Sequence, residues 1–142
     1  MRYEESSLID KKSHNNYIEK IYYFERIDII VLYEQNMKKV VIYSGVDLSW
    51  IQDIDCQSNI LAIEYCTERN VIAISLADLN IVFFEGKIFA KKEETTQIKT
   101  RLHVPQTQKC LRYIHRKTGG DLLFTASVSG SIFAFNLQDL FN

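Results

Sequence analysis

The three histidines are the first candidates for chemistry, because imidazole serves both as a metal ligand and as a general base. They are His14, His103 and His115. None stands three to five residues from another histidine, or from a cysteine, in a pattern typical of zinc ligands. His115 lies five residues beyond Cys110 on an apolar segment, where a packed or turn residue is expected far more often than a ligand. The histidines therefore predict no metal site.

Carboxylates and a thiol lie close together in one other segment. Asp53 and Asp55 alternate along an expected strand, so both side chains point to one face. Two acids on one face can act as general acid and base or bind a hard cation. No loop glycine or further oxygen ligand is near, which favours a solvated strand face. The same acids are expected to raise the pKa of Cys56 and weaken it as a nucleophile.

Motifs for a nucleophile or a bound phosphate are missing from the sequence. No Gly-x-Ser-x-Gly segment occurs, and Gly119-Gly120 lacks the downstream Lys-Ser/Thr of a P-loop. The 17 basic and 18 acidic residues leave a net charge of −1, which provides no cationic surface for a nucleic-acid backbone. We expect a protein that is not an enzyme, carries no cofactor or metal, and does not bind nucleic acid.

The sequence also lacks export and membrane signals. Residues 1–16 are polar, and apolar runs such as 71–74 are far too short to span a bilayer. The three cysteines, at positions 56, 66 and 110, are scattered and odd in number. That pattern favours thiols in a reducing compartment over a disulfide framework. We expect a cytoplasmic protein without a membrane partner.

A pair of apolar segments recurs along the chain, each pair consisting of a strand, a short polar turn and a second strand with an aromatic residue near its end. The pairs are 28–33 with 40–44, 70–75 with 81–85, and 121–126 with 132–136. The aromatic residues Tyr43, Phe84 and Phe135 are 41 and 51 residues apart. Four-stranded propeller blades repeat every ~40–45 residues. The longer interval implies an insertion, which we place at 91–99 and expect to be dispensable for folding. Phe84 and Phe135 are expected to be buried at equivalent places.

Further strands are expected on both sides of each pair. First strands are predicted at Ile18–Phe24, Ile60–Tyr65 and Cys110–His115. Outer strands are predicted at Ser49–Cys56 and at either Gly86–Ala90 or the region leading to His103. Residues 17–22 also show partial helical spacing, but the repeat register favours a strand there.

The segment Leu122–Leu137, LLFTASVSGSIFAFNL, resembles the second and third strands of a WD repeat. That family commonly has Asp-Gly in the turn and Trp-Asp at the end of the third strand. Here Ser129-Gly130 and Phe135-Asn136 occupy those places, while the middle repeat has Asp78 in its turn and Phe84-Glu85 at its end. No Gly-His dipeptide precedes a repeat, so the buried His/Ser/Asp/Trp hydrogen-bond set of the family is missing. The resemblance implies a β-propeller.

We therefore predict an all-β fold, a partial WD-repeat β-propeller of about three four-stranded antiparallel blades. The blades are placed at residues 17–56, 57–104 and 105–142, and the last one lacks its outer strand. Blades bury their apolar faces against neighbouring blades, and about four are the minimum for a ring. The rest of a longer protein or a second chain is expected to complete the sheets. Residues 1–142 in isolation are expected to fold poorly or to self-associate.

A second resemblance concerns Trp50 and Asp53, which precede a repeat that ends in Phe84-Glu85. The arrangement is similar to divergent WD-repeat proteins of motile cilia, in which a Trp-x-x-Asp segment often opens a blade. It implies a non-catalytic protein-binding scaffold, a structural protein in a ciliary axoneme complex whose partners are other proteins. Two alternatives remain: a propeller-based enzyme, and a regulatory adaptor subunit of another cytoplasmic complex.

Six residues are candidates for contacts with a partner protein: Trp50, Arg69, Asp78, Ser129, Ile132 and Phe133. Trp50 fits an interface anchor, although a core position between blades is the more common place for a tryptophan. The polar turn residues would either converge on a pocket, as in an enzyme, or line a contact face. Ile132 and Phe133 belong to a last strand whose bare edge is a template for strand addition.

Overall fold

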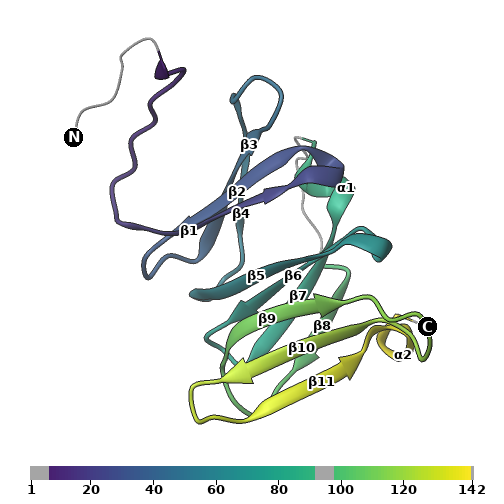
Figure 1. The fold of residues 1–142 in the computed structure, drawn as a ribbon. Helices are drawn as coiled ribbons and strands as arrows, with labels where there is room; N and C mark the ends of the chain where they lie inside the picture. The colour runs from purple at the N-terminus through teal and green to yellow at the C-terminus, as the bar shows by residue number, and fades with distance from the viewer. Residues whose placement is uncertain (1–6, 92–97, 142) are drawn as a thin grey trace.

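The computed structural model describes residues 7–91 and 98–141, whose regular secondary structure consists mainly of β-strands (Figure 1). In the described residues, eleven strands make three antiparallel sheets, two of four strands and one of three. The predicted all-β class, a partial propeller of about three blades with a three-stranded last blade, is confirmed. We call the sheets blade 1, blade 2 and blade 3 in chain order.

Within each blade the strands lie side by side in the order of the sequence. Blade 1 consists of β1 (Ile18–Phe24), β2 (Ile29–Glu34), β3 (Lys39–Ser44) and β4 (Trp50–Asp55). Blade 2 consists of β5 (Ile60–Cys66), β6 (Val71–Leu76), β7 (Asn80–Glu85) and β8 (Thr100–His103). Blade 3 consists of β9 (Gln108–Ile114), β10 (Leu122–Ser127) and β11 (Ile132–Asn136). The described helices are single turns: α1 (Gly86–Phe89), α2 (Leu137–Leu140), η2 (Glu25–Ile27) and η3 (Thr67–Arg69).

Two of the alternatives left open by the sequence are resolved by strand pairing. The helical interpretation of residues 17–22 is wrong, because β1 pairs with β2 from Ile18 to Phe24. The segment Gly86–Ala90 is not an outer strand, because Gly86–Phe89 forms α1. The backbone N–H of Gly86 donates to the carbonyl of Asn70 (2.7 Å), and the chain leaves the sheet at that point. The outer strand of blade 2 is β8, which ends at His103.

The predicted repeat register is reproduced by the pairing of the second and third strands. Phe84 lies opposite Ile72 in blade 2, and Phe135 lies opposite Leu123 in blade 3. Phe84 is 1% exposed, as expected. Phe135 is only half-buried, which corrects the prediction that both rings are buried. The reason is that β11 is an edge strand, so no outer strand shields the ring of Phe135.

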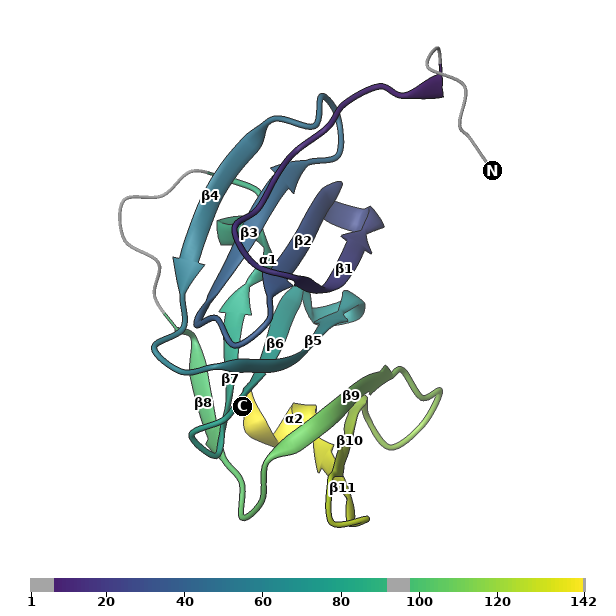
Figure 2. The ribbon, with the colours of Figure 1, turned by 90° about the vertical axis from the view of Figure 1, so that its left-hand side faces the viewer.

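The core consists of two layers, one between blades 1 and 2 and one between blades 2 and 3. The three blades follow one another as stacked sheets (Figure 2). Every residue of β6 is buried, because blade 2 is covered on both faces. Ile72 and Ile74 pack toward blade 1, while Ala73 and Phe83 pack toward blade 3. A strand covered on both faces carries a continuous apolar run instead of an alternating one, which explains the sequence Val-Ile-Ala-Ile in β6.

The described ends of the predicted insertion at 91–99 take part in packing, although residues 92–97 lie outside the described residues. The carbonyl of Lys91 accepts a hydrogen bond from Gln52 Nε2 (2.7 Å). Ile98 packs against the core between blades 1 and 2. The backbone N–H of Lys99 donates to Phe83 O (2.7 Å), and its Nζ lies 2.6 Å from Glu85 Oε1. Deleting the whole of 91–99 would remove these contacts, so the predicted dispensability does not extend to Lys91, Ile98 and Lys99.

The turns between the second and third strands explain one unusual leucine. Asn36, Leu79 and Gly130 each lie in one of these turns with a positive φ, of 59°, 68° and 90°. Asparagine and glycine tolerate this left-handed conformation, whereas other residues lose about 1–2 kcal/mol in it. We expect the free energy of unfolding of Leu79→Asn to be about 1 kcal/mol higher than that of Leu79→Ala. Both variants lose the leucine side chain, but only alanine keeps the backbone strain of the left-handed conformation. Urea denaturation measures the difference, and equal stabilities would contradict the strain.

Candidate protein-interaction surface

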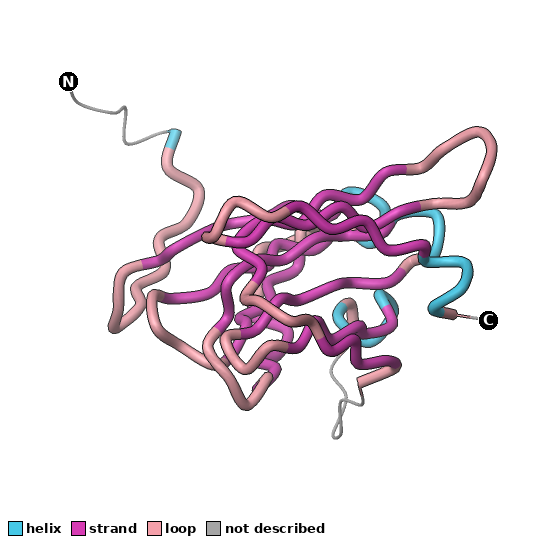
Figure 3. Tube along the Cα trace, turned by 90° about the horizontal axis from the view of Figure 1, so that it is seen from below, coloured by secondary structure: helices cyan, strands magenta, loops and turns pink. Residues whose placement is uncertain are grey.

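One corner of each blade is built from a tyrosine and an aspartate or asparagine. The tyrosine is the next-to-last residue of the first strand, and the Asx residue directly precedes the second strand. The hydroxyl donates to the Asx side chain in all three blades: Tyr23 to Asp28 (2.9 Å), Tyr65 to Asn70 (2.6 Å) and Tyr113 to Asp121 (2.8 Å). In blades 1 and 2 the short helices η2 and η3 connect the tyrosine to the Asx residue. Most of the short helical turns lie toward one end of the strands (Figure 3).

The Asx residue also closes the end of the third strand. Its carbonyl accepts a backbone N–H in each blade: Asp28 from Gly45 (2.8 Å), Asn70 from Gly86 (2.7 Å) and Asp121 from Leu137 (3.0 Å). Asp28 and Asn70 are left-handed, with φ of 50°, a conformation that Asx side chains tolerate. A Cβ on Gly45 or Gly86 would collide with the Asx side chain, so glycine is required there. Sequence reasoning missed this corner, although a Tyr-x₄-Asx pattern occurs at 23–28 and again at 65–70.

Arg69, a candidate partner contact, is paired inside the chain at the junction of blades 2 and 3. Its Nε donates to both carboxylate oxygens of Asp121 (3.0 and 2.8 Å), and its Nη2 donates to Oδ1 (2.8 Å). The guanidinium also lies 5.6 Å from the ring centroid of Phe141. We call Arg69, Asp121 and Tyr113 the inter-blade clamp.

The charge state of the clamp follows from its contacts. Burial alone would raise the pKa of Asp121, but the hydrogen bonds from Arg69 and Tyr113 outweigh burial and hold that pKa below its ordinary value. Burial, followed by the hydrogen bond to Asp121, raises the pKa of the Tyr113 hydroxyl. The clamp is therefore an ionised carboxylate held between a guanidinium and a neutral phenol.

Trp50 lies on the outer face of blade 1 and is 50% exposed, so the expected core position between blades is wrong. No other sheet of the described chain covers this face, where Ile21 and Tyr23 are also exposed. Trp50 Nε1 donates to Asp53 Oδ1 (2.8 Å), and Lys39 Nζ lies 3.1 Å from Asp53 Oδ2. The exposed tryptophan is thus held in place, as an interface anchor requires.

Part of the same face lies beneath the segment that precedes β1. His14 Nε2 is hydrogen-bonded to the Tyr43 hydroxyl (3.0 Å), and Lys12 Nζ lies 4.8 Å from the centroid of the Tyr43 ring. The backbone N–H of Asn16 donates to Glu34 Oε1 (3.0 Å). These contacts tie the segment to one part of the face and leave Trp50 exposed.

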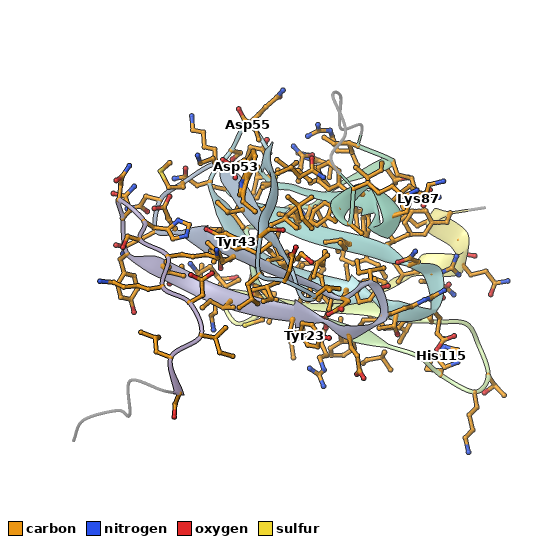
Figure 4. All side chains as sticks on the ribbon, turned by 90° about the horizontal axis from the view of Figure 1, so that it is seen from above. Tyr23, Tyr43, Asp53, Asp55, Lys87 and His115 are labelled. Atoms are coloured by element: carbon orange, nitrogen blue, oxygen red, sulfur yellow. The ribbon has the colours of Figure 1, made fainter. Side chains whose placement is uncertain are left out.

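The carboxylates Asp53 and Asp55 both lie exposed at one margin of blade 1 (Figure 4). In the described part of the chain, no group of three His, Cys, Asp or Glu side chains is placed to hold a metal ion. The neighbouring Cys56 is buried. Burial, more than the charge of Asp55, raises the pKa of this thiol to about 12. From the sequence, the higher pKa of Cys56 had been expected from the charges of Asp53 and Asp55 alone.

Ile132 and Phe133 lie on opposite faces of β11, since side chains alternate along a strand. Ile132 is 66% exposed on the outer face of blade 3, where Phe124 and Cys110 are also exposed. Phe133 is half-buried on the other face, with its ring centroid 6.2 Å from that of Phe135. In the described chain β11 pairs only with β10, so its other edge carries no strand.

The three polar turn candidates do not converge on one pocket. Arg69 precedes β6, whereas Asp78 follows β6, so the two lie at opposite ends of that strand. Ser129 lies in the turn between β10 and β11, where its Oγ donates to Gln106 Oε1 (2.8 Å). Asp78 is exposed in the turn between β6 and β7. The three residues therefore neither converge on a pocket nor line one shared contact face.

Comparisons with known proteins support the fold through structure alone. No protein-family model and no curated protein matches the chain. Among solved structures, Sqt1 of Saccharomyces cerevisiae is 11% identical with a TM-score of 0.67, over 91% of this chain and 34% of that one. Raptor of Chaetomium thermophilum is 13% identical with a TM-score of 0.63, over 83% of this chain and 11% of that one. BBS1N, solved in complex with ARL6DN, is 13% identical with a TM-score of 0.59, over 75% of this chain and 31% of that one.

These similar structures are propeller-type proteins, and the chain spans about a third or less of each. At this level of identity the similarity establishes the fold: three blades of a β-propeller. None of the helices in the described residues is long and apolar enough to cross a membrane.

Proposed function

We propose that the chain is a non-catalytic protein-binding scaffold that offers propeller surfaces to other proteins. The observation that carries the proposal is the free edge of β11, which among the described residues has a partner strand on one side only. A row of unpaired backbone N–H and C=O groups accepts an added strand from another polypeptide. The exposed side chain of Ile132 on this strand adds apolar contact area, and Phe124 of the neighbouring β10 is exposed on the same face. BBS1N, one of the similar structures, was solved with a protein partner, which supports the same class of role.

The enzyme alternative gains no support from the site. Its polar candidates are dispersed, and the thiols of Cys56 and Cys66 are buried. Burial raises the pKa of both thiols, whereas a catalytic cysteine needs a lowered one. The third cysteine, Cys110, is exposed on the outer face of blade 3. It has no histidine beside it in β9 that could act as a base.

At a finer level, we propose a WD-repeat type of scaffold in a cytoplasmic complex, specifically a ciliary axoneme. The support is the Trp50-x-x-Asp53 segment, whose tryptophan and aspartate are hydrogen-bonded at the start of β4. Expression of the tagged protein in a ciliated cell tests the location. Signal along the axoneme is expected, and a signal confined to the cell body would favour a regulatory adaptor subunit of another cytoplasmic complex.

The scaffold role is tested at the β11 edge with a matched pair of variants. We expect Ile132→Lys to release proteins that co-purify with the tagged wild type, because a lysine beside an open edge opposes strand addition. Val46→Lys places the same charge at another exposed apolar position, in blade 1, and is expected to retain them. Hydrogen exchange of the purified complex should show protection, missing from the free chain, of those amides of Ile132–Asn136 that point away from β10. Unchanged partners in Ile132→Lys, together with unprotected amides, would refute the edge as a binding surface.

A further inference from the structure

The outer face of blade 3 carries a row of three side chains that lie opposite one another on neighbouring strands. Arg112 of β9 pairs with Phe124 of β10, which pairs in turn with Ala134 of β11. All three are exposed, including the large ring of Phe124. In blade 2 the corresponding positions of the second and third strands are Ala73 and Phe83, which are buried against blade 3. The row therefore lies on the face through which a blade contacts the polypeptide packed beside it.

Two polar positions of blade 2 contact blade 3 across their junction. Glu64 directly precedes the corner tyrosine Tyr65, and its Oε2 accepts the backbone N–H of Tyr113 (2.8 Å). Arg69 lies four residues after Tyr65 and binds the carboxylate of Asp121. One position thus accepts a hydrogen bond from the neighbouring blade, and the other donates to it.

Both of these positions are cationic in blade 3. Arg112 directly precedes the corner tyrosine Tyr113, and Lys117 lies four residues after it. Both side chains are exposed. Within the described part of the chain, neither side chain forms a hydrogen bond, an ion pair or a contact with an aromatic ring. A polypeptide packed on this face therefore meets hydrogen-bond donors and positive charge at both positions.

Few acids are available in blade 3 to neutralise this charge. Residues 105–142 contain four Lys or Arg residues and two acidic ones, Asp121 and Asp139. Asp121 is bound by Arg69 of blade 2. Asp139 lies in α2, which follows β11, the strand at the opposite edge of the sheet from β9. The outer face of blade 3 is thus complementary in charge to an acidic surface.

We propose that the outer face of blade 3 binds an acidic polypeptide segment of a partner protein. Carboxylates of the segment pair with Arg112 and Lys117. Apolar side chains of the segment pack on Phe124 and Ile132, which are exposed on the same face. The inference rests on the proposed scaffold role and adds the chemistry of the partner.

The donor and acceptor pattern favours such a segment over another blade. A blade packed as blade 3 packs on blade 2 would place a backbone N–H, like that of Tyr113, beside Arg112, so that two donors would face each other. A carboxylate instead accepts from the guanidinium, through two parallel hydrogen bonds where the geometry allows. Hydrogen bonds of this charge-assisted kind are about twice as strong as neutral ones.

Fluorescence anisotropy of a labelled probe peptide tests the proposal. The probe is a short peptide of glutamate, leucine and serine, and its counterpart has glutamine in place of every glutamate. The 142-residue chain should bind the glutamate peptide about tenfold more tightly than the glutamine peptide. Added salt should reduce this preference, because it screens exposed charges.

Three variants separate the charged contact from the apolar one. Arg112→Gln should reduce the preference for the glutamate peptide severalfold. Phe124→Ser should weaken binding of both peptides alike, because it removes apolar contact area and no charge. Arg101→Gln is the matched control, since Arg101 is an exposed arginine on β8 of blade 2, and the preference should stay unchanged. Circular dichroism should confirm that every variant is folded.

Equal binding of the two peptides would refute the acidic partner. It would leave the scaffold role standing, because co-purification with Ile132→Lys tests that role separately. An Arg112→Gln variant that keeps the full preference would contradict the proposal as well. Tighter binding of a single-stranded DNA than of the glutamate peptide would assign the face to nucleic acid, and self-association that Arg112→Gln abolishes would assign it to a second copy. Either result would overturn the proposal.

Discussion

Phe84→Ala is expected to lower the free energy of unfolding by about 3–5 kcal/mol, the cost of removing a large aromatic side chain from a packed core. The ring is 1% exposed between blades 1 and 2, with its centroid 5.6 Å from that of Phe89. Both neighbouring strands, β6 and β8, restrict how far the cavity can collapse. Urea or guanidinium denaturation measures the loss.

Phe135→Ala is the matched control, because Phe135 holds the same register position in blade 3. Its ring is half-buried on an edge strand, so less apolar surface is removed from water. We expect it to cost about half as much as Phe84→Ala, since the transfer free energy scales with buried apolar area. Equal losses would show that the outer strand contributes nothing to the burial of this position.

The sequence predicted the blade register well because that register depends on a local pattern. Apolar strands, polar turns and one aromatic residue per repeat are all visible along the chain. The predicted first strand Ile18–Phe24 coincides with β1. The predicted strand Ser49–Cys56 differs from β4 by one residue at each end. Both strands are bounded by turns that the sequence marks clearly.

The candidate site was predicted less well because it depends on contacts between distant residues. Arg69 lies in a polar turn and binds the carboxylate of Asp121, which is 52 residues away in the sequence. Trp50 is exposed because no blade of the described chain covers its face, which its own sequence neighbours do not indicate.

Buried polar contacts between blades were also not predicted. The Gln108 side chain is fully buried and accepts a hydrogen bond from Thr125 Oγ1 (2.7 Å), while the Gln108 carbonyl accepts one from Ser75 Oγ (2.7 Å). These three polar residues lie on strands of two blades, β6 in blade 2 and β9 and β10 in blade 3. Periodicity identifies apolar faces but cannot show which polar side chains find partners inside them.

Asp121→Asn is expected to lower the free energy of unfolding by about 2–3 kcal/mol at pH 7. The variant keeps the shape of the side chain but removes the charge that binds Arg69, and hydrogen bonds to charged groups are worth about 1.5–3 kcal/mol. The carboxylate side chain is 7% exposed and that of Arg69 is 25% exposed, so the pair is only partly screened by water. Asp28→Asn is the control. It should cost less than about 0.5 kcal/mol, because no arginine pairs with Asp28 within the described chain.

The same clamp sets a dependence of stability on pH. The pKa of Asp121 is lower in the folded chain than its ordinary value, because the hydrogen bonds from Arg69 and Tyr113 outweigh the opposing effect of burial. A group with a depressed folded pKa stabilises the fold fully above its unfolded pKa, about 3.9 for aspartate, and loses that contribution as the pH falls through the folded value. The stability difference between wild type and Asp121→Asn should therefore be constant from pH 7 to about pH 5 and shrink below about pH 4. Denaturation curves collected across this range measure it. A difference that stays constant down to pH 2 would mean that Arg69 stabilises the junction through packing on Phe141 and not through the charge of Asp121.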